Sequence, residues 1–134
     1  MFRFSESSSQ RLATTQDIVQ QIVKRALEIS HVDFGIPKFG GKRTAQQQKQ
    51  LFDEGKSQCD GYTNKSYHQT GMAIDFYAFV SGKATWEPVY LAMVAAAMLQ
   101  AATEFGVQAE WGGLWSSKDG SMYGWDCGHI QFKL

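Results

Sequence analysis

The stretch Ser66–Asp75, with the sequence SYHQTGMAID, and the tetrapeptide DCGH near the C-terminus decide how this chain is interpreted. Together they offer two imidazoles and one carboxylate, from His68, Asp75 and His129, a ligand set suited to Zn²⁺. Three protein ligands leave the fourth position of a tetrahedral ion open, as catalysis requires. The two segments therefore predict a catalytic zinc site, with Asp126 as the candidate general base.

The same stretch predicts how the chain folds back on itself. His68 and Asp75 are too far apart for one helical turn, but a sharp turn at Gly71 followed by an extended segment returns Asp75 to the side of His68. If the strand that begins at His129 pairs beside that segment, the three ligands converge. Burying Asp75 without compensation would cost several kcal/mol, which favours a nearby cation. Spacing alone leaves open that each histidine is an ordinary structural residue.

Hydrophobic periodicity predicts the remaining elements, and helix-capping and helix-breaking residues indicate where they end. Thr44 and Gln47 have the form of a capping box, Pro88 is tolerated in a first helical turn, and Gly106 is typical of a helix stop. The expected helices cover residues 15–29, 44–54 and 87–105, and the expected strands cover 72–80, 107–111 and 129–134. The Ala-rich middle of the third helix indicates close packing. The pattern predicts an α+β fold in which helices pack on a small antiparallel sheet.

Length and charge limit the possible partners. With 134 residues the chain is expected to form one domain, covering residues 1–134, with no second module. The 13 basic and 13 acidic residues give no net charge, so we expect no nucleic-acid partner. We also expect no membrane insertion and no signal peptide, hence synthesis in the cytoplasm. Cys59 and Cys127 are expected to be free thiols.

Several motifs together resemble a known family. They are the first stretch, the pair Asp126 and His129, the upstream Arg43 with Gln47, and the block WGGLW at 111–115. This order resembles the zinc peptidases of the D-alanyl-D-alanine carboxypeptidase (VanY-type) group. More narrowly, it is similar to the L-alanyl-D-glutamate peptidases that serve as bacteriophage endolysins. The resemblance implies a hedgehog/DD-peptidase-like fold.

The resemblance also implies roles for individual residues. His68, Asp75 and His129 would bind one Zn²⁺ per chain. Asp126 would take a proton from the attacking water and deliver it to the leaving amine. Arg43 would stabilise the oxyanion or hold a substrate carbonyl, although a solvated arginine at a helix start remains an alternative.

Four further residues are expected near the substrate. Ser66 and Gln69 flank the first histidine and are also suited to hydrogen bonds within the ligand loop. Trp111 and Trp115 would line a groove for peptide or glycan, although aromatic residues near glycines are as often core packing. The Lys118–Trp125 loop is expected to be a plain solvated loop, with a lid or a weak cation site as alternatives.

The leading functional hypothesis is therefore a phage endolysin that hydrolyses the peptidoglycan stem peptide, at the bond between L-Ala and D-Glu. A monomer is expected, acting on the cell wall in the periplasm after a holin releases it. Two alternatives remain open. One is a carboxypeptidase or dipeptidase acting on D-Ala-D-Ala, and the other is a non-catalytic zinc-bearing binding module.

Overall fold

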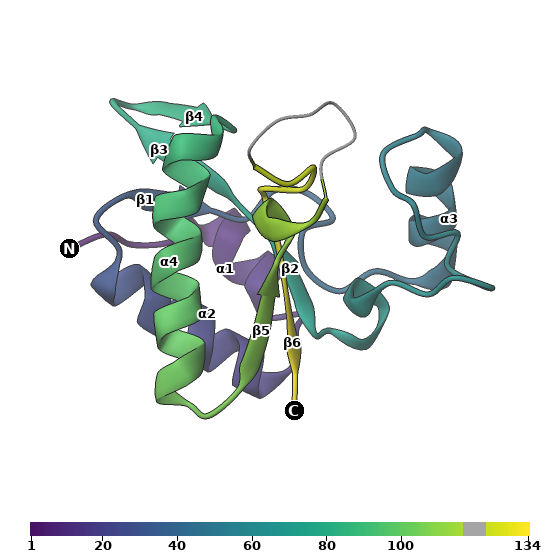
Figure 1. Ribbon diagram of the computed structural model, residues 1–134, viewed down its shortest axis with the longest axis horizontal. Coiled ribbons are helices and arrows are strands. Elements are labelled where there is room, and N and C mark those ends of the chain that lie inside the picture. The colour runs from purple at the N-terminus through teal and green to yellow at the C-terminus, as the bar shows by residue number, and fades with distance from the viewer. Residues whose placement is uncertain (117–122) are drawn as a thin grey trace.

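The computed structural model describes residues 1–116 and 123–134. It combines helices with short antiparallel strands, which confirms the predicted α+β class (Figure 1). The helices are α1 (Glu6–Leu12), α2 (Asp17–Ile29), α3 (Ala45–Asp53) and α4 (Pro88–Glu104), with two short 3₁₀ helices, η1 (Tyr67–Thr70) and η2 (Gly112–Leu114). The strands are β1 (Asp33–Gly35), β2 (Ala73–Asp75), β3 (Tyr77–Val80), β4 (Lys83–Thr85), β5 (Gln108–Trp111) and β6 (His129–Lys133).

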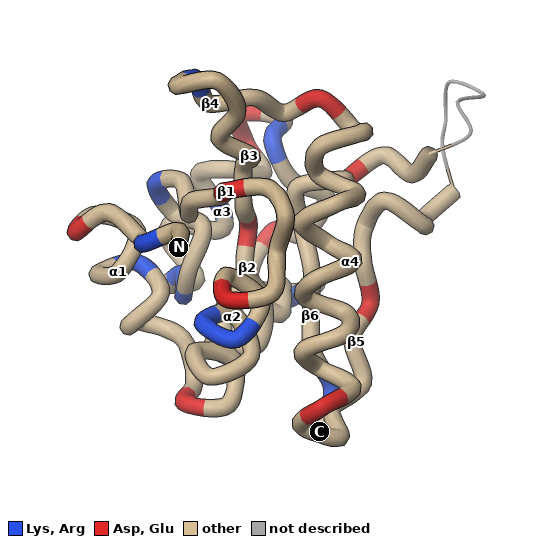
Figure 2. The backbone as a smooth tube through the Cα atoms, turned by 90° about the vertical axis from the view of Figure 1, so that its left-hand side faces the viewer, with Lys and Arg blue, Asp and Glu red and all other residues tan. Residues whose placement is uncertain are grey.

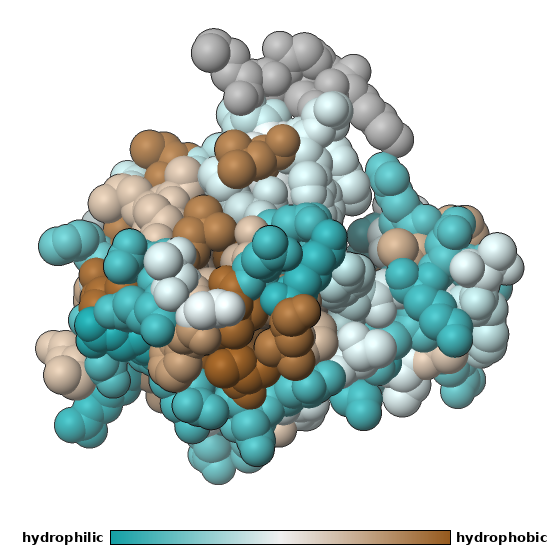
Figure 3. Space-filling view, turned by 60° about the horizontal axis from the view of Figure 1, so that its bottom comes forward, coloured by the Kyte–Doolittle hydropathy of each residue, from teal (hydrophilic) through white to brown (hydrophobic). Residues whose placement is uncertain are grey.

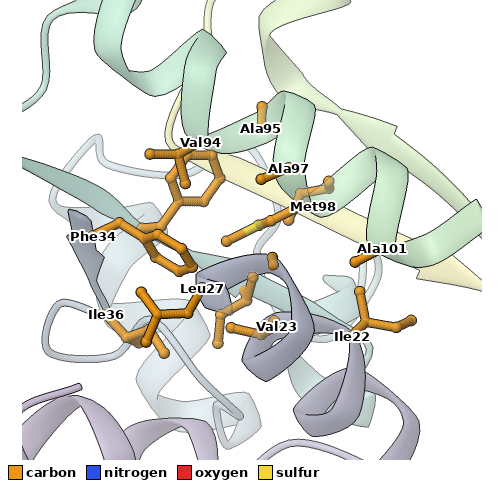
Figure 4. Packing of buried hydrophobic residues seen from close by; sticks show 14 of the residues in the cluster. Ile22, Val23, Leu27, Phe34, Ile36, Val94, Ala95, Ala97, Met98 and Ala101 are labelled. Atoms are coloured by element: carbon orange, nitrogen blue, oxygen red, sulfur yellow. The ribbon is translucent and has the colours of Figure 1, made fainter. Parts of the chain in front are cut away.

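The apolar core lies between α2 and α4. Ile22 and Val23 of α2 lie opposite Met98 and Ala101 of α4, and Phe34 of β1 belongs to the same cluster (Figure 4). All five side chains are buried. The alanines along α4 leave room for a close approach of the two helices, so the close packing predicted from the Ala-rich segment is confirmed.

The helix ends follow the predicted signals. Thr44 and Gln47 form the expected capping box, in which each side chain bonds the backbone of the other residue. Pro88 occupies the first turn of α4, where the missing amide hydrogen costs nothing. Gly106, with a φ of 70°, follows the end of that helix.

The strands form two small antiparallel sheets where the sequence predicted one. The first has the order β1-β3-β4 and the second has the order β2-β6-β5. In the second sheet Asp75 pairs opposite His129, so the predicted pairing of these two strands is confirmed. Both sheets are needed to place the site, because the chain passes from one to the other immediately after Asp75.

The single strand expected over residues 72–80 is wrong, since the segment is divided at Phe76. The backbone amide of Asp75 donates to the Gly40 carbonyl, and the amide of Phe76 donates to the Gly128 carbonyl. The chain thus changes hydrogen-bond partners at this point, and β2 and β3 enter different sheets. The sequence gives no sign of such a change, because strand-forming residues continue on both sides of Phe76.

Helix α1 and strand β4 are among the elements that were not predicted. Helix α1 buries only Ser8 and Leu12, too few residues to give an apolar period, and it begins with a cap from Ser5. Strand β4 has three exposed or half-buried residues and follows a turn at Ser81 and Gly82. This strand therefore carries no hydrophobic signal.

The surface is polar and of mixed charge. Basic and acidic residues are interspersed along the elements (Figure 2), and hydrophobic side chains gather in smaller patches between hydrophilic ones (Figure 3). Helix α3 stands to one side of the β2–β6 pair, away from the α2–α4 layer (Figure 1). In the part of the chain that the structure describes, no helix is both long and apolar enough to span a bilayer.

Candidate metal centre

His68, Asp75 and His129 come from three elements that meet at one end of the β2–β6 pair. His68 lies in η1, Asp75 ends β2, and His129 begins β6. Between the first two, Gly71 reverses the chain with a φ of 73°, a conformation that glycine adopts at little cost. The cap of η1 is Ser66, whose hydroxyl accepts from the His68 amide. Local turn chemistry thus brings the predicted ligands together.

The three candidate ligand atoms form a nearly equilateral triangle. His68 Nε2 lies 3.1 Å from Asp75 Oδ1 and 3.2 Å from His129 Nδ1, and the third side, from His129 Nδ1 to Asp75 Oδ1, is 3.2 Å. Three vertices of a tetrahedron around Zn²⁺ with bonds of about 2.0 Å would be separated by about 3.3 Å. The cluster could therefore hold a metal ion of that size.

Outer partners fix the ring nitrogens that carry protons. His68 Nδ1 donates to the Gly41 carbonyl oxygen at 2.9 Å, because a carbonyl can only accept. His129 Nε2 donates to Gln131 Oε1 at 2.9 Å, and the amide of Gln131 in turn donates to Glu110. Both imidazoles consequently present an unprotonated nitrogen to the centre of the triangle. With Asp75 Oδ1, three lone pairs converge on one point, an arrangement that calls for a cation.

Arg43 holds the carboxylate of the cluster from outside. Its Nη2 donates to Asp75 Oδ2 at 2.6 Å, its Nη1 donates to Gln48 Oε1, and its Nε donates to the Phe39 carbonyl. The arginine is buried, so it is not the solvated residue that the alternative interpretation envisaged. The oxygen of Asp75 that faces the histidines is left free for a metal ion.

The electrostatics of the cluster favour an ionised carboxylate. Burial raises the pKa of Asp75, but His68 and His129 together lower it well below its ordinary value. Burial lowers the pKa of His68, and Asp75 only partly offsets this. For His129 burial also lowers the pKa, but Asp75 and Asp126 raise it above the ordinary value. A proton at low pH would therefore compete with a metal for His129.

Asp126 lies beside the cluster but outside the triangle. Its carboxyl group is half-buried, and this burial raises its pKa to about 6, although His129 and Arg43 act in the opposite direction. A carboxylate with a pKa close to neutrality is suited to accept and return a proton. The position agrees with the base role predicted for Asp126.

Gly112 holds the backbone of Asp126 in place. The Asp126 amide donates to the Gly112 carbonyl at 3.3 Å, and a side chain at position 112 would collide with the Asp126 backbone. Gly113 similarly packs against the ring of Trp111. The glycine pair of the WGGLW block is therefore explained by close packing under the candidate base.

The cluster opens into a cleft of about 290 Å³, here called the metal cleft. Its lining combines the three candidate ligands and Asp126 with polar, basic and aromatic residues: Arg43, Lys56, Ser57, Gln58, Cys59, Lys65, Ser66, Tyr67, Trp115, Trp125 and Gln131. The ring of Trp115 lies 5.3 Å from that of His129 and 5.2 Å from that of Trp125. One side of the metal position is thus available to a ligand from solution.

The four residues expected at the substrate divide into two pairs. Ser66 and Trp115 line the metal cleft. Gln69 instead bonds the backbone of Ser66 and the Gly61 carbonyl, and Trp111 donates its indole hydrogen to the Cys127 carbonyl at 2.7 Å. Neither of this second pair lines the cleft, so their placement corrects the expectation and indicates structural roles. Both cysteines are free thiols, as predicted.

Sequence reasoning did not identify several residues of the cleft. Gln131 lies two residues after His129 on β6, and thus on the same face of the strand, but its residue type indicates no role. Lys56 and Lys65 lie in the polar loop after α3, where lysine is ordinary. Of the expected solvated loop, residues 118–122 lie outside the described residues.

A His-Asp-His triangle that opens into a cleft beside a carboxylate of raised pKa could hold one metal ion, and this arrangement is typical of metallohydrolases. Comparison with known proteins agrees with this class. The family model described as phage L-alanyl-D-glutamate peptidase matches residues 1–132. The chain therefore belongs to this family, which confirms the resemblance drawn from the motifs.

Two relatives support the assignment. An L-alanyl-D-glutamate peptidase of Escherichia phage T5 is 36% identical over 117 residues, which cover 87% of this chain and 83% of the relative. The crystal structure of the L-Ala D-Glu endopeptidase ChiX of Serratia marcescens matches with a TM-score of 0.79 and 31% identity. That match covers 99% of this chain and 90% of ChiX.

Proposed function

We propose that this protein is a zinc-dependent peptidase that hydrolyses the L-Ala–D-Glu bond of the peptidoglycan stem peptide. The observation that carries the proposal is the triangle of three unprotonated ligand atoms with Asp126 beside it, in a member of this family. The names of the phage T5 and Serratia relatives support the choice of bond.

Zinc is the ion that best fits the residues. Two imidazole nitrogens and one carboxylate oxygen from His68, His129 and Asp75 are a common catalytic zinc set, and the triangle has the size that set requires. When bound, the ion would supply a Lewis acid that polarises the scissile carbonyl and acidifies a water molecule.

The chain's own residues supply the proton transfers and the positioning. Asp126 would accept a proton from the attacking water and return it to the leaving amine, for which its raised pKa is suited. Arg43 would keep Asp75 in place and, as part of the cleft lining, would hold a substrate carbonyl or the oxyanion. Ser66 and Trp115 would contact the peptide, since both line the metal cleft.

We further infer that the protein acts as a monomeric single-domain endolysin in host lysis. It would be made in the cytoplasm and would reach peptidoglycan in the periplasm after a holin opens the inner membrane. Family membership supports this biological role. A non-catalytic zinc module is disfavoured because such a site has no use for an open side or for a nearby base such as Asp126.

The test is a digest of purified Gram-negative peptidoglycan by zinc-loaded protein, with the products identified by mass spectrometry. We expect disaccharide that retains only L-Ala, together with free peptides that begin at D-Glu. Asp126→Asn protein and chelator-treated protein serve as controls, and both should release neither product. Loss of terminal D-Ala alone would establish a carboxypeptidase instead. No chelator-sensitive product at all would favour the binding module.

A further inference from the structure

A second cavity adjoins the metal cleft on the side of α4. It has a volume of about 510 Å³ and is here called the aromatic cavity, because its walls include Trp86, Tyr123 and Trp125. Asp75, Trp125 and Asp126 line both cavities. The two hollows therefore share a boundary at the candidate metal centre, and a substrate that extends across this boundary would reach both.

The two cavities differ in charge. The metal cleft is lined by three cations, Arg43, Lys56 and Lys65. Of these, Arg43 is paired with Asp75, and Lys56 lies 3.4 Å from Glu54 at the exposed rim. Among the described residues that line the aromatic cavity, charge is confined to Asp75 and Asp126 at the shared boundary. An anionic part of a substrate is thus favoured in the metal cleft, and a neutral part is favoured in the aromatic cavity.

Trp86 is the most exposed feature of the aromatic cavity. The residue is 59% exposed and lies between β4 and α4. Its ring packs against that of Tyr77 with centroids 5.5 Å apart, and the Glu87 amide that follows donates to the Thr85 hydroxyl. Trp86 is therefore held as a firm platform with one face open to a ligand.

The proposed substrate has a matching asymmetry. On one side of the scissile bond, L-Ala is joined through an amide to the lactyl group of N-acetylmuramic acid, so this side is a neutral sugar. On the other side, D-Glu continues through its γ-carboxyl group and keeps a free α-carboxylate. The anionic D-Glu side of the bond thus matches the metal cleft with its cations, and the neutral sugar side matches the aromatic cavity.

We propose that the aromatic cavity is the subsite for the muramyl sugar, with Trp86 packed against its ring, and that Lys56 and Lys65 receive the carboxylate of D-Glu. This inference rests on the proposed function. It adds the direction in which the substrate lies across the metal centre, and a preference for stem peptides that are linked to glycan. The sugar ring offers apolar C–H faces to the indole, while its amide and hydroxyl groups remain in water.

The test compares two substrates that share the scissile bond. One is N-acetylmuramyl-L-Ala-D-Glu extended by the stem peptide, and the other has an N-acetyl group in place of the sugar. We expect the wild type to prefer the sugar-bearing substrate in kcat/KM. Trp86→Ala should lower that preference about tenfold, mainly through KM, and Trp86→Phe should restore part of it. Phe105→Ala, a change of an exposed aromatic residue at the far end of α4, should leave the preference as in the wild type.

A second pair of measurements separates the two cavities. Lys65→Gln should lower kcat/KM for both substrates by the same factor, because both carry D-Glu. Free N-acetylmuramyl-L-alanine should inhibit competitively, with an inhibition constant about tenfold higher for Trp86→Ala than for the wild type.

Three results would overturn the inference: no wild-type preference for the sugar, an equal effect of Trp86→Ala on both substrates, or no effect on either. The proposed function fails separately, if the wild type cleaves neither substrate between L-Ala and D-Glu.

Discussion

The α2–α4 layer and the end of the β2–β6 pair both bury most of their side chains, but they are built from opposite kinds of side chain. In the first, Ile22, Val23 and Met98 are fully buried and need no specific partner. In the second, the buried His68 and His129 each donate from the outer ring nitrogen to a fixed partner, Gly41 or Gln131. The first interior tolerates approximate shape, whereas the second depends on individual atoms. Stability and chemistry should therefore respond to different substitutions.

The largest effect on catalysis is expected from Asp126→Asn. The amide cannot accept the proton of the attacking water, so kcat should fall by about a thousandfold, within the range for general bases. The thermal midpoint and the zinc content should stay near those of the wild type, because Asp126 lies outside the ligand triangle. Turnover of soluble muropeptides, with metal analysis of the same samples, measures both. Asp53→Asn, an exposed change on α3, is the matched control. Wild-type turnover in the Asp126 variant would remove it from the mechanism.

Lowering the pH should reduce activity by protonating Asp126. Asp126 is competent only when ionised, and its pKa is raised to about 6, so kcat/KM should be constant above that pH and fall about tenfold per unit below it. A bound divalent cation stabilises the carboxylate and moves the midpoint downward, so pH 6 is an upper limit. A pH–rate profile with saturating zinc checks the sign. A rate that increases on acidification contradicts the assignment.

Gln131→Leu should have a smaller effect, which is a lower affinity for the metal ion. Gln131 accepts the Nε2 hydrogen of His129 and is itself bonded to Glu110, so its loss frees the ring to rotate or change tautomer. Removal of such an outer partner typically weakens metal binding by about 10- to 100-fold. Competition with a chromophoric chelator measures this change. Gln108→Leu, on exposed β5, should bind zinc as the wild type does. Equal affinities for the two variants would show that the Gln131 contact is dispensable.

Met98→Ala should leave catalysis nearly untouched while it weakens the fold. The side chain is fully buried between α2 and α4, and its truncation should lower the free energy of unfolding by about 2 to 5 kcal/mol. Urea denaturation measures this change, and kcat at low temperature should stay within about twofold of the wild type. Met93→Ala, on the exposed side of the same helix, provides the comparison. A large loss of kcat in folded Met98→Ala protein would show that the two interiors are coupled.

The same division explains what the sequence could predict. Helices α2 and α4 have long apolar patterns, and the ligand loop has a specific arrangement of His68, Gly71 and Asp75, so both were predicted. Helix α1 was missed because a buried serine, Ser8, carries part of its packing through a bond to the backbone of Ile36. The division of the strand at Phe76 depends on backbone hydrogen bonds from Asp75 to Gly40 and from Phe76 to Gly128, which are distant in the sequence, so no local pattern encodes it.

The sequence predicted the group formed by His68, Asp75 and His129, and the base role of Asp126 stays a prediction. The supporting contacts of the site were not predicted. The roles of Gln131 and Gln48 depend on which side chains the two sheets and α3 bring together, and glutamine has no characteristic spacing. Trp111 and Gln69 show the converse error. Both lie in motifs that carry the resemblance, yet their polar groups are used within the protein.

Zinc stoichiometry tests the central claim most directly. Wild-type, Asp126→Asn and His68→Ala proteins would be stripped with chelator, reloaded with zinc, dialysed and analysed by elemental mass spectrometry, with circular dichroism to verify folding. In our account Asp126 is not one of the three metal ligands. We therefore expect one zinc per chain in the wild type and in Asp126→Asn, and almost none in His68→Ala. Full zinc in folded His68→Ala protein, or loss of zinc in Asp126→Asn, would contradict the proposed metal centre.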